Sequence, residues 1–199
     1  MIGCYVYHAL ETQGLTLIKP SFSTHGERWV YATKDIVMAA LFLSGKGGDL
    51  TCAVGREGDI PYVCERFVGA FDYRYANVSG SIYVLPSETF IENETQWEEE
   101  VVSESEVTPV EEMRIDDVKG FLIEQSDNGK LKILFYPNRI AEIPDDDEDL
   151  VYRGIIWTRK MGEIILENFR KYHSHLISRI QRGLEENRYL NDGFYAEQK

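Results

Sequence analysis

Over the first two thirds of the chain, short runs rich in β-branched and aromatic residues alternate with turn-forming residues. Such runs are typical of β-strands, and the glycines, asparagines and prolines between them are typical of tight connections. The strands predicted in this way cover residues 4–8, 29–32, 61–67, 80–85, 100–103, 107–115 and 130–136. Because these strands are short and are followed by helical segments, the pattern predicts an α+β fold.

Helices are predicted in three places. Residues 36–43 are apolar nearly all round, which favours a helix buried between layers, with Thr33 as its N-cap and Asp35 in its first turn. A second helix is expected from 116 to about 125. From 155 to about 190 the apolar positions follow a helical spacing, which predicts one long helix or a broken pair.

The helical pattern at the end of the chain is separated from the strands by a short acidic segment. Pro144 precedes a run of five acidic residues at 145–149, which is typical of a linker. We therefore expect an α+β domain over residues 1–142, an acidic linker over 143–150 and a C-terminal helical extension over 151–199.

Composition narrows the classes of partner. A hydrophobic content of 43% in 199 residues is enough for a real core. Lys and Arg number 21 against 34 Asp and Glu, and the net charge of −13 repels phosphate backbones and anionic lipid surfaces. The longest apolar run, 36–43, is too short to cross a bilayer, and the first residues lack a signal-peptide pattern. We expect a cytoplasmic protein with no nucleic-acid or membrane partner.

Metal and disulfide chemistry is not indicated. Cys4, Cys52 and Cys64 are odd in number, widely spaced and without a C-x-x-C unit, so reduced thiols are expected. His173 and His175 lie two apart in a predicted helix and would point to different faces, unlike the i, i+4 pair of helical zinc sites. The acidic run at 145–149 also lacks the spacing of an EF-hand loop.

Three polar or aromatic residues mark candidate chemistry, each on or beside its own predicted strand. These are His8, Tyr31 and a glutamate before residue 101. In an extended strand Glu98 and Glu100 share one face and Glu99 the other, and we favour Glu100 because it leads directly into the strand. Each also has a structural interpretation: a strand histidine satisfied by a neighbour, a packed tyrosine, or a solvated acid in an acid-rich stretch.

In this order, and across residues 4–115, these three positions resemble the ADP-ribosyltransferase-like fold of the histidine-tyrosine-glutamate type. The likeness is to small bacterial members related to the poly-ADP-ribose polymerase and RNA 2′-phosphotransferase branches. It implies split antiparallel sheets that grip NAD in a cleft. It also implies that His8 binds the nicotinamide ribose, that Tyr31 stacks on nicotinamide, and that Glu100 stabilises the oxocarbenium-like state as nicotinamide leaves.

The same resemblance points to residues that would contact other parts of NAD. The residue after the histidine offers backbone groups to the nicotinamide amide; here Ala9 stands where the family usually has glycine. In the loop between the first two motifs, the side chains that could meet the phosphates are Ser23, Thr24, His25 and Arg28. The chain contains no G-x-G-x-x-G, Walker or G-x-S-x-G pattern, so Rossmann, P-loop and serine-hydrolase sites are unsupported.

Two functions of different classes follow from the sequence. The first is an ADP-ribosyltransferase or NAD glycohydrolase, with a protein or water as acceptor; the acidic charge makes RNA an unattractive substrate. The second is a non-catalytic module that keeps the fold and binds a protein partner through its acidic surface or C-terminal helix. The apolar side of that helix is available either to cap the core or to pair with a second copy of the chain.

Overall fold

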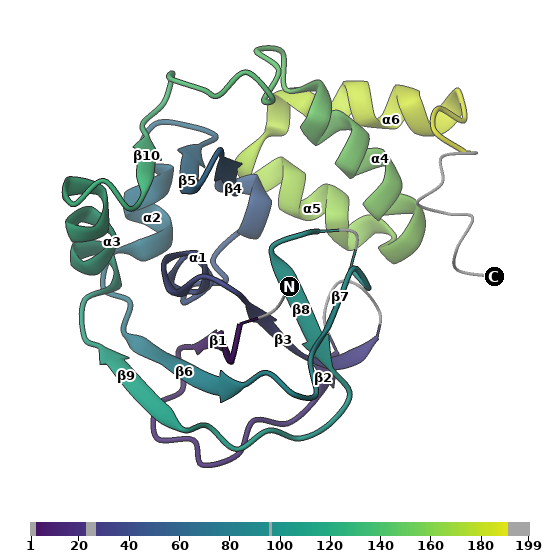
Figure 1. The fold of residues 1–199 in the computed structure, drawn as a ribbon. Coiled ribbons are helices and arrows are strands. Elements are labelled where there is room, and N and C mark those ends of the chain that lie inside the picture. Colours follow the sequence, from purple (N-terminus) through teal and green to yellow (C-terminus); the bar gives the residue numbers. More distant parts are fainter. Residues whose placement is uncertain (1–2, 23–26, 96, 191–199) are drawn as a thin grey trace.

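The computed structural model describes residues 3–22, 27–95 and 97–190, and these residues form an α+β fold with two separate sheets (Figure 1). The larger sheet has the strand order β7-β8-β3-β1-β6-β9, with β2 paired to β3, and all its pairs are antiparallel. Its strands are β1 (Tyr5–Leu10), β2 (Ser21–Phe22), β3 (Arg28–Thr33), β6 (Gly80–Pro86), β7 (Ile91–Glu92), β8 (Glu100–Ser103) and β9 (Glu111–Ile115).

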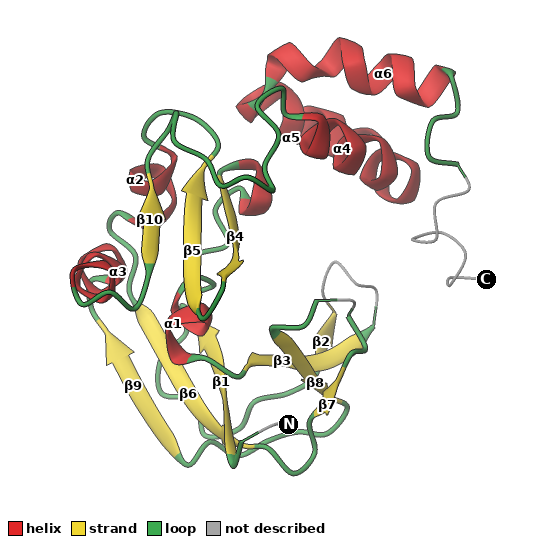
Figure 2. Cartoon of the chain, turned by 45° about the horizontal axis from the view of Figure 1, so that its top comes forward, coloured by secondary structure: helices red, strands yellow, loops and turns green. Residues whose placement is uncertain are grey.

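The smaller sheet has the order β10-β5-β4, formed by β4 (Cys52–Glu57), β5 (Ile60–Glu65) and β10 (Lys132–Leu134). Strands β4 and β5 form an antiparallel hairpin, whereas β10 runs parallel to β5. The helices are α1 (Ile36–Ala40), α2 (Ala70–Tyr75), α3 (Val118–Asp127), α4 (Glu148–Met161), α5 (Glu163–Tyr172) and α6 (Ile177–Glu185), with 3-10 turns η1 (Gly48–Leu50) and η2 (Ser174–Leu176). Figure 2 shows α4, α5 and α6 grouped beside the smaller sheet.

Helix α1 lies between the two sheets, in agreement with its apolar sequence. Its residues 37–40 are buried and share one core with residues of β4, β5 and β6. The N-cap is Asp35 and not Thr33 as expected: its carboxylate accepts from the amides of Val37 and Met38 at 2.7 and 3.3 Å. Thr33 instead ends β3, because it pairs with Glu100 of β8.

Helix α2 and strand β4 lie in a region where only two strands were identified from the sequence. Gly69, at a φ of 81°, turns the chain into α2, and the buried carboxylate of Glu65 accepts from the amide of Phe71 at 2.8 Å. The second oxygen of Glu65 accepts from the amide of Tyr136 at 3.0 Å. A side chain distant in sequence therefore starts this six-residue helix, which has no strong helical pattern of its own.

The described part of the C-terminal region, up to residue 190, forms three α-helices in place of the one or two expected. Gly162, at a φ of 80°, separates α4 from α5, and His173 ends α5 where its Nε2 lies 2.6 Å from the carbonyl oxygen of Leu50. Helices α4 and α6 approach closely at Gly154 and Gly183, where a Cβ would lie 2.6 Å from Ile180 and 2.2 Å from Ile155 respectively. The three helices bury a core of their own, which includes Leu50 next to the smaller sheet.

The segment 143–150, expected as a linker, is docked on the rest of the protein. Arg139 donates to the carboxylate of Asp147 at 2.6 Å, and Arg66 forms an ion pair with Asp149 at 2.5 Å. Helix α4 begins within this segment at Glu148. The acidic residues thus fix α4 to the body of the fold. Within the described residues, no helix is long and apolar enough to cross a bilayer.

We expect Gly80→Ala to lower the free energy of unfolding by about 1–3 kcal/mol. A Cβ at Gly80 would lie 2.5 Å from the carbonyl oxygen of Leu10 and 3.1 Å from the Cα of Glu11, so the backbone after β1 would have to move. Urea denaturation measures the loss. Gly45→Ala is the matched control, because no described atom lies within 4 Å of a Cβ there. Equal stabilities of the two variants would contradict this close approach.

Candidate functional site

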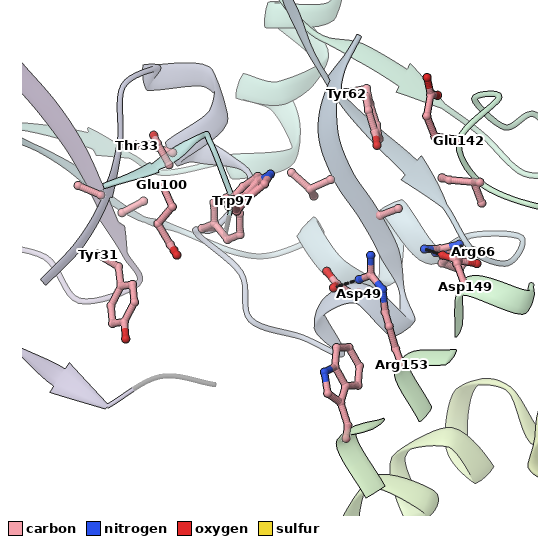
Figure 3. A pocket seen from close by; sticks show the side chains of 18 of the residues that line it. Tyr31, Thr33, Asp49, Tyr62, Arg66, Trp97, Glu100, Glu142, Asp149 and Arg153 are labelled. Atoms are coloured by element: carbon pink, nitrogen blue, oxygen red, sulfur yellow. Dashed lines mark hydrogen bonds and ion pairs between the residues drawn. The ribbon is translucent and has the colours of Figure 1, made fainter. Parts of the chain in front are cut away.

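A cleft of about 780 Å³ lies between the two sheets and is bordered on one side by α4. Residues of β1, β3 and β8 line it from the larger sheet, and residues of β4 and β5 line it from the smaller sheet. Figure 3 shows Tyr31, Thr33 and Glu100 on one side of this cleft and Arg66 and Arg153 on the other, with Trp97 between them. Its volume is that of a typical small-molecule or cofactor site.

The structure brings His8, Tyr31 and Glu100 together along this cleft. They come from β1, β3 and β8, which are consecutive neighbours in the larger sheet, and all three line the cleft. Their strands are held in register by the pairs Tyr7–Thr33 and Thr33–Glu100. The register therefore places Tyr31 and Glu100 on one face of the larger sheet, and the side chain of His8, which follows Tyr7 in β1, reaches the backbone carbonyl of Tyr31.

The glutamates before β8 point to different places. Glu100 lines the cleft, whereas Glu99 binds Arg56 through two hydrogen bonds of 2.5 and 2.8 Å, and Glu98 is exposed. The strand begins only at Glu100, after a turn in which its amide donates to the carbonyl of Trp97 at 3.0 Å. The expected strand alternation of Glu98 with Glu100 is therefore wrong, because Glu98 and Glu99 belong to this turn.

The imidazole of His8 is fixed in one tautomer. Its Nδ1 lies 2.5 Å from the carbonyl oxygen of Tyr31, and since a carbonyl only accepts, Nδ1 carries the proton. Burial lowers the pKa of His8, and the hydrogen bond to Tyr31 opposes this only in part. The ring is therefore neutral near pH 7, and Nε2 is left as an acceptor on a residue that lines the cleft.

The ring of Tyr31 is positioned by contacts at both ends of the residue. Its hydroxyl donates to the carbonyl oxygen of Glu27 at 2.9 Å, and its ring lies against Trp29 with a centroid separation of 6.0 Å. The backbone carbonyl of the same residue holds His8. Tyr31 thus presents a positioned aromatic ring to the cleft.

Of the residues expected to contact other parts of NAD, one lines the cleft and one does not, and the remaining three are outside the described part of the chain. Ala9 follows His8 in β1 and lines the cleft. Arg28 is exposed, does not line the cleft, and donates through Nε to the carbonyl of Pro20 at 3.1 Å, because it pairs β3 with the short strand β2. Ser23, Thr24 and His25 lie outside the described residues.

The far wall of the cleft was not anticipated from the sequence. Helix α4 contributes Arg153, Trp157 and Lys160, although the C-terminal region was assigned to a separate extension. Two ion pairs on this wall join α4 to the smaller sheet and η1, Arg66 with Asp149 and Arg153 with Asp49. The spacing i, i+4, i+7 of two bases and an indole on one helix face was the signal that could have identified this wall.

The buried thiols are unsuited to nucleophilic catalysis. Burial raises the pKa of Cys52 to about 12 and also raises that of Cys64, so both remain protonated near pH 7. Among the described residues, no group of three or more histidine, cysteine or acidic side chains is arranged to hold a metal ion. The reactive groups that line the cleft are therefore the imidazole, the carboxylates and the bases.

The buried His173 resembles the half-buried His8 in its electrostatics. Burial lowers the pKa of His173, and the hydrogen bond between its ring and the Leu50 carbonyl opposes this lowering in part. In the unfolded chain both imidazoles take up a proton near their ordinary pKa of about 6.5, whereas in the folded protein they stay neutral. The unfolded state therefore binds more protons than the folded state below that pH.

We expect the free energy of unfolding to fall as the pH is lowered from about 7.5 to about 5.5. His8 and His173 each contribute up to about 1.4 kcal/mol per pH unit below the unfolded pKa of the histidine. Carboxylates with a lowered pKa, such as Glu112 and Glu148, lose their contribution only at lower pH, below about 4.5. Urea denaturation across this range measures the slope, which His8→Asn should halve. A stability independent of pH would contradict the assignment of neutral, buried rings.

Comparison with known proteins provides no relative: no family model, no curated protein and no solved structure matches this chain.

Proposed function

We propose that the protein binds NAD in this cleft and cleaves the bond between nicotinamide and ribose, passing ADP-ribose to a protein or to water. One observation carries the proposal: His8, Tyr31 and Glu100 lie on three neighbouring strands and line the same cleft. This is the set of residues, in the same chain order, on which the resemblance to ADP-ribosyltransferases rests. The cleft lies between two sheets, as such a site requires.

The tautomer of His8 suits a role in holding the nicotinamide ribose. Because Nδ1 donates to Tyr31, Nε2 can accept a hydrogen bond from a ribose hydroxyl. The lowered pKa keeps Nε2 unprotonated near neutral pH, so the acceptor is present there. Binding at this atom would fix the sugar relative to Glu100 on the neighbouring wall.

The aromatic side chains of the cleft suit a flat ring. Tyr31 offers a π-face to the cationic nicotinamide, and the attraction is lost once the ring leaves as a neutral molecule. The cleft also contains Tyr7, Phe42, Tyr62 and Trp97, with Trp97 packed edge-on against Phe42 at a centroid distance of 5.5 Å. A cleft with this lining favours planar, partly charged ligands over lipids or extended peptides.

Glu100 supplies the negative charge that the reaction needs. When the bond from ribose to nicotinamide breaks, its electron pair leaves with nicotinamide, and positive charge develops on the ribose. The half-buried carboxylate of Glu100 would therefore stabilise the transition state, in which this charge develops, more than the ground state. It could act on the charge directly or through a ribose hydroxyl. The acceptor oxygen or nitrogen then bonds to the same carbon and releases its proton.

Calorimetric titration of NAD into the purified full chain tests the proposal. We expect saturable binding with the wild type, and binding weakened by at least about tenfold in His8→Ala, which removes one hydrogen bond and one wall of the site. His175→Ala is the matched control, since His175 is largely exposed and does not line the cleft. No heat at millimolar NAD would overturn the proposal and favour the module that binds a protein partner.

A further inference from the structure

Helix α4 closes the end of the cleft opposite Tyr31 and Glu100 (Figure 3). We infer that the face of α4 formed by Arg153, Trp157 and Lys160 binds the adenosine diphosphate half of NAD. The inference rests on the proposed function and extends it, because it assigns the second half of the substrate to a helix outside the region of resemblance. The three residues are called the α4 face below.

The α4 face is a continuous stripe. Arg153, Trp157 and Lys160 are spaced i, i+4, i+7 and therefore lie along one side of the helix. All three line the same cleft as His8 and Glu100. A single ligand can thus touch the catalytic strands at one end and this stripe at the other.

Arg153 suits a phosphate. Its side chain is 37% exposed, and its ion pair with Asp49 uses only Nη1. Within the part of the chain that the structure describes, no hydrogen bond engages its Nε or Nη2. A planar guanidinium with two remaining donor groups can bind a diphosphate through paired hydrogen bonds. Lys160 is exposed one turn beyond Trp157 and adds a second positive charge on the same face.

Arg66, on the same wall, is excluded from this role. Its side chain is only 1% exposed, and both terminal nitrogens bind the carboxylate of Asp149. It anchors the start of α4 and leaves ligand contacts to the bases further along the helix. Of the two arginines on this wall, Arg153 therefore has donor groups left for a ligand, whereas both terminal nitrogens of Arg66 are already engaged.

Trp157 suits a purine. It is half-buried, and the guanidinium of Arg153 lies 6.0 Å from the centre of its ring. An indole fixed in this way offers a surface on which the purine can stack. The phosphates would then lie beside it, within reach of the basic side chains Arg153 and Lys160.

The charges around the α4 face balance. Asp49, Glu142 and Asp149 line this end of the cleft together with Arg66, Arg153 and Lys160. Because the acids equal the bases, geometry and stacking hold the diphosphate more than a strong positive field does. We therefore expect affinity that is modest and that changes little as salt is added.

Titration of two overlapping fragments of NAD, which share one phosphate, tests the inference. ADP and nicotinamide mononucleotide are titrated into the full chain by calorimetry. We expect Trp157→Ala and Lys160→Gln each to weaken ADP binding by about tenfold, and to leave nicotinamide mononucleotide unaffected. His8→Ala should do the reverse. Lys130→Gln is the matched control for Lys160→Gln, because Lys130 is exposed and does not line the cleft.

The outcomes separate this inference from the proposed function. Unchanged ADP affinity in both α4 variants overturns the inference, and NAD binding that still depends on His8 then leaves the proposed function standing. ADP binding that depends on Trp157, with no binding of nicotinamide mononucleotide and NAD no tighter than ADP, supports the α4 face and overturns the proposed function. Absence of binding by ADP and by NAD overturns both.

Discussion

Replacing Glu100 by glutamine is expected to slow the release of nicotinamide from NAD by about 10²–10³-fold and to change NAD binding only a few-fold. Glutamine keeps the shape and one acceptor oxygen of the side chain but removes its charge. In the proposed reaction NAD already carries its positive charge on nicotinamide, at the far side of the bond, so the charge that Glu100 would stabilise develops mainly as the bond breaks. The loss should therefore appear in kcat and much less in KM.

Glu98→Gln is the matched control for this measurement. Glu98 is exposed in the turn before β8, two residues from Glu100, and does not line the cleft. It makes the same change of net charge, so any general electrostatic effect on NAD appears in both variants. Nicotinamide release is followed by chromatography at saturating NAD. Equal rates for wild type and Glu100→Gln would remove Glu100 from the mechanism.

Replacing Arg74 by methionine is expected to lower the free energy of unfolding by about 3–5 kcal/mol. Arg74 is only 3% exposed and donates to four backbone carbonyl oxygens, with distances of 3.1–3.3 Å. These carbonyls belong to Leu41, Ser44, Gly48 and Cys52, so one guanidinium gathers the chain from the end of α1 to the start of β4. Methionine fills part of the volume but leaves these acceptors short of donors.

Arg170→Met is the control, because Arg170 is 47% exposed and its contact with Glu163 lies on the surface. Urea denaturation compares the two variants, and a loss below about 1 kcal/mol for Arg74→Met would contradict its structural role. The change should also reach the cleft. The segment that Arg74 organises carries Asp49, the partner of Arg153, so ADP binding should weaken in parallel with stability.

Local patterns in the sequence predicted the elements that carry the first half of the site. The β-branched and aromatic runs around His8 and Tyr31 are strands β1 and β3, and the apolar run after Tyr31 is the buried helix α1. Asp117 caps α3 close to where the pattern placed its start. These strands and helices are determined by residues close together in sequence. Hydrophobic periodicity and secondary-structure propensity were therefore sufficient to predict them.

The other half of the site depends on contacts that no local pattern contains. Arg66 meets Asp149 across 83 residues, and Arg153 meets Asp49 across 104. These pairs, and not the helical period, bring α4 to the cleft. Likewise, Arg56 binds Glu99, which lies 43 residues away in the sequence. Of the three consecutive glutamates 98–100, Glu99 is therefore held by Arg56, and Glu100 lines the cleft. The acidic run at 145–149, whose composition is typical of a linker, supplies the carboxylates for such contacts.

Two of the three tryptophans, Trp97 and Trp157, line the cleft, and Trp29 lies against the ring of Tyr31 with a centroid separation of 6.0 Å. The protein therefore has a built-in optical probe of its own interior. Any planar molecule that enters should change the intensity of its ultraviolet emission, without a label. The two ends of the cleft would report separately, because Trp97→Phe leaves Trp157 of α4 as the indole that lines the cleft and Trp157→Phe leaves Trp97, with Trp29 as a background common to both variants.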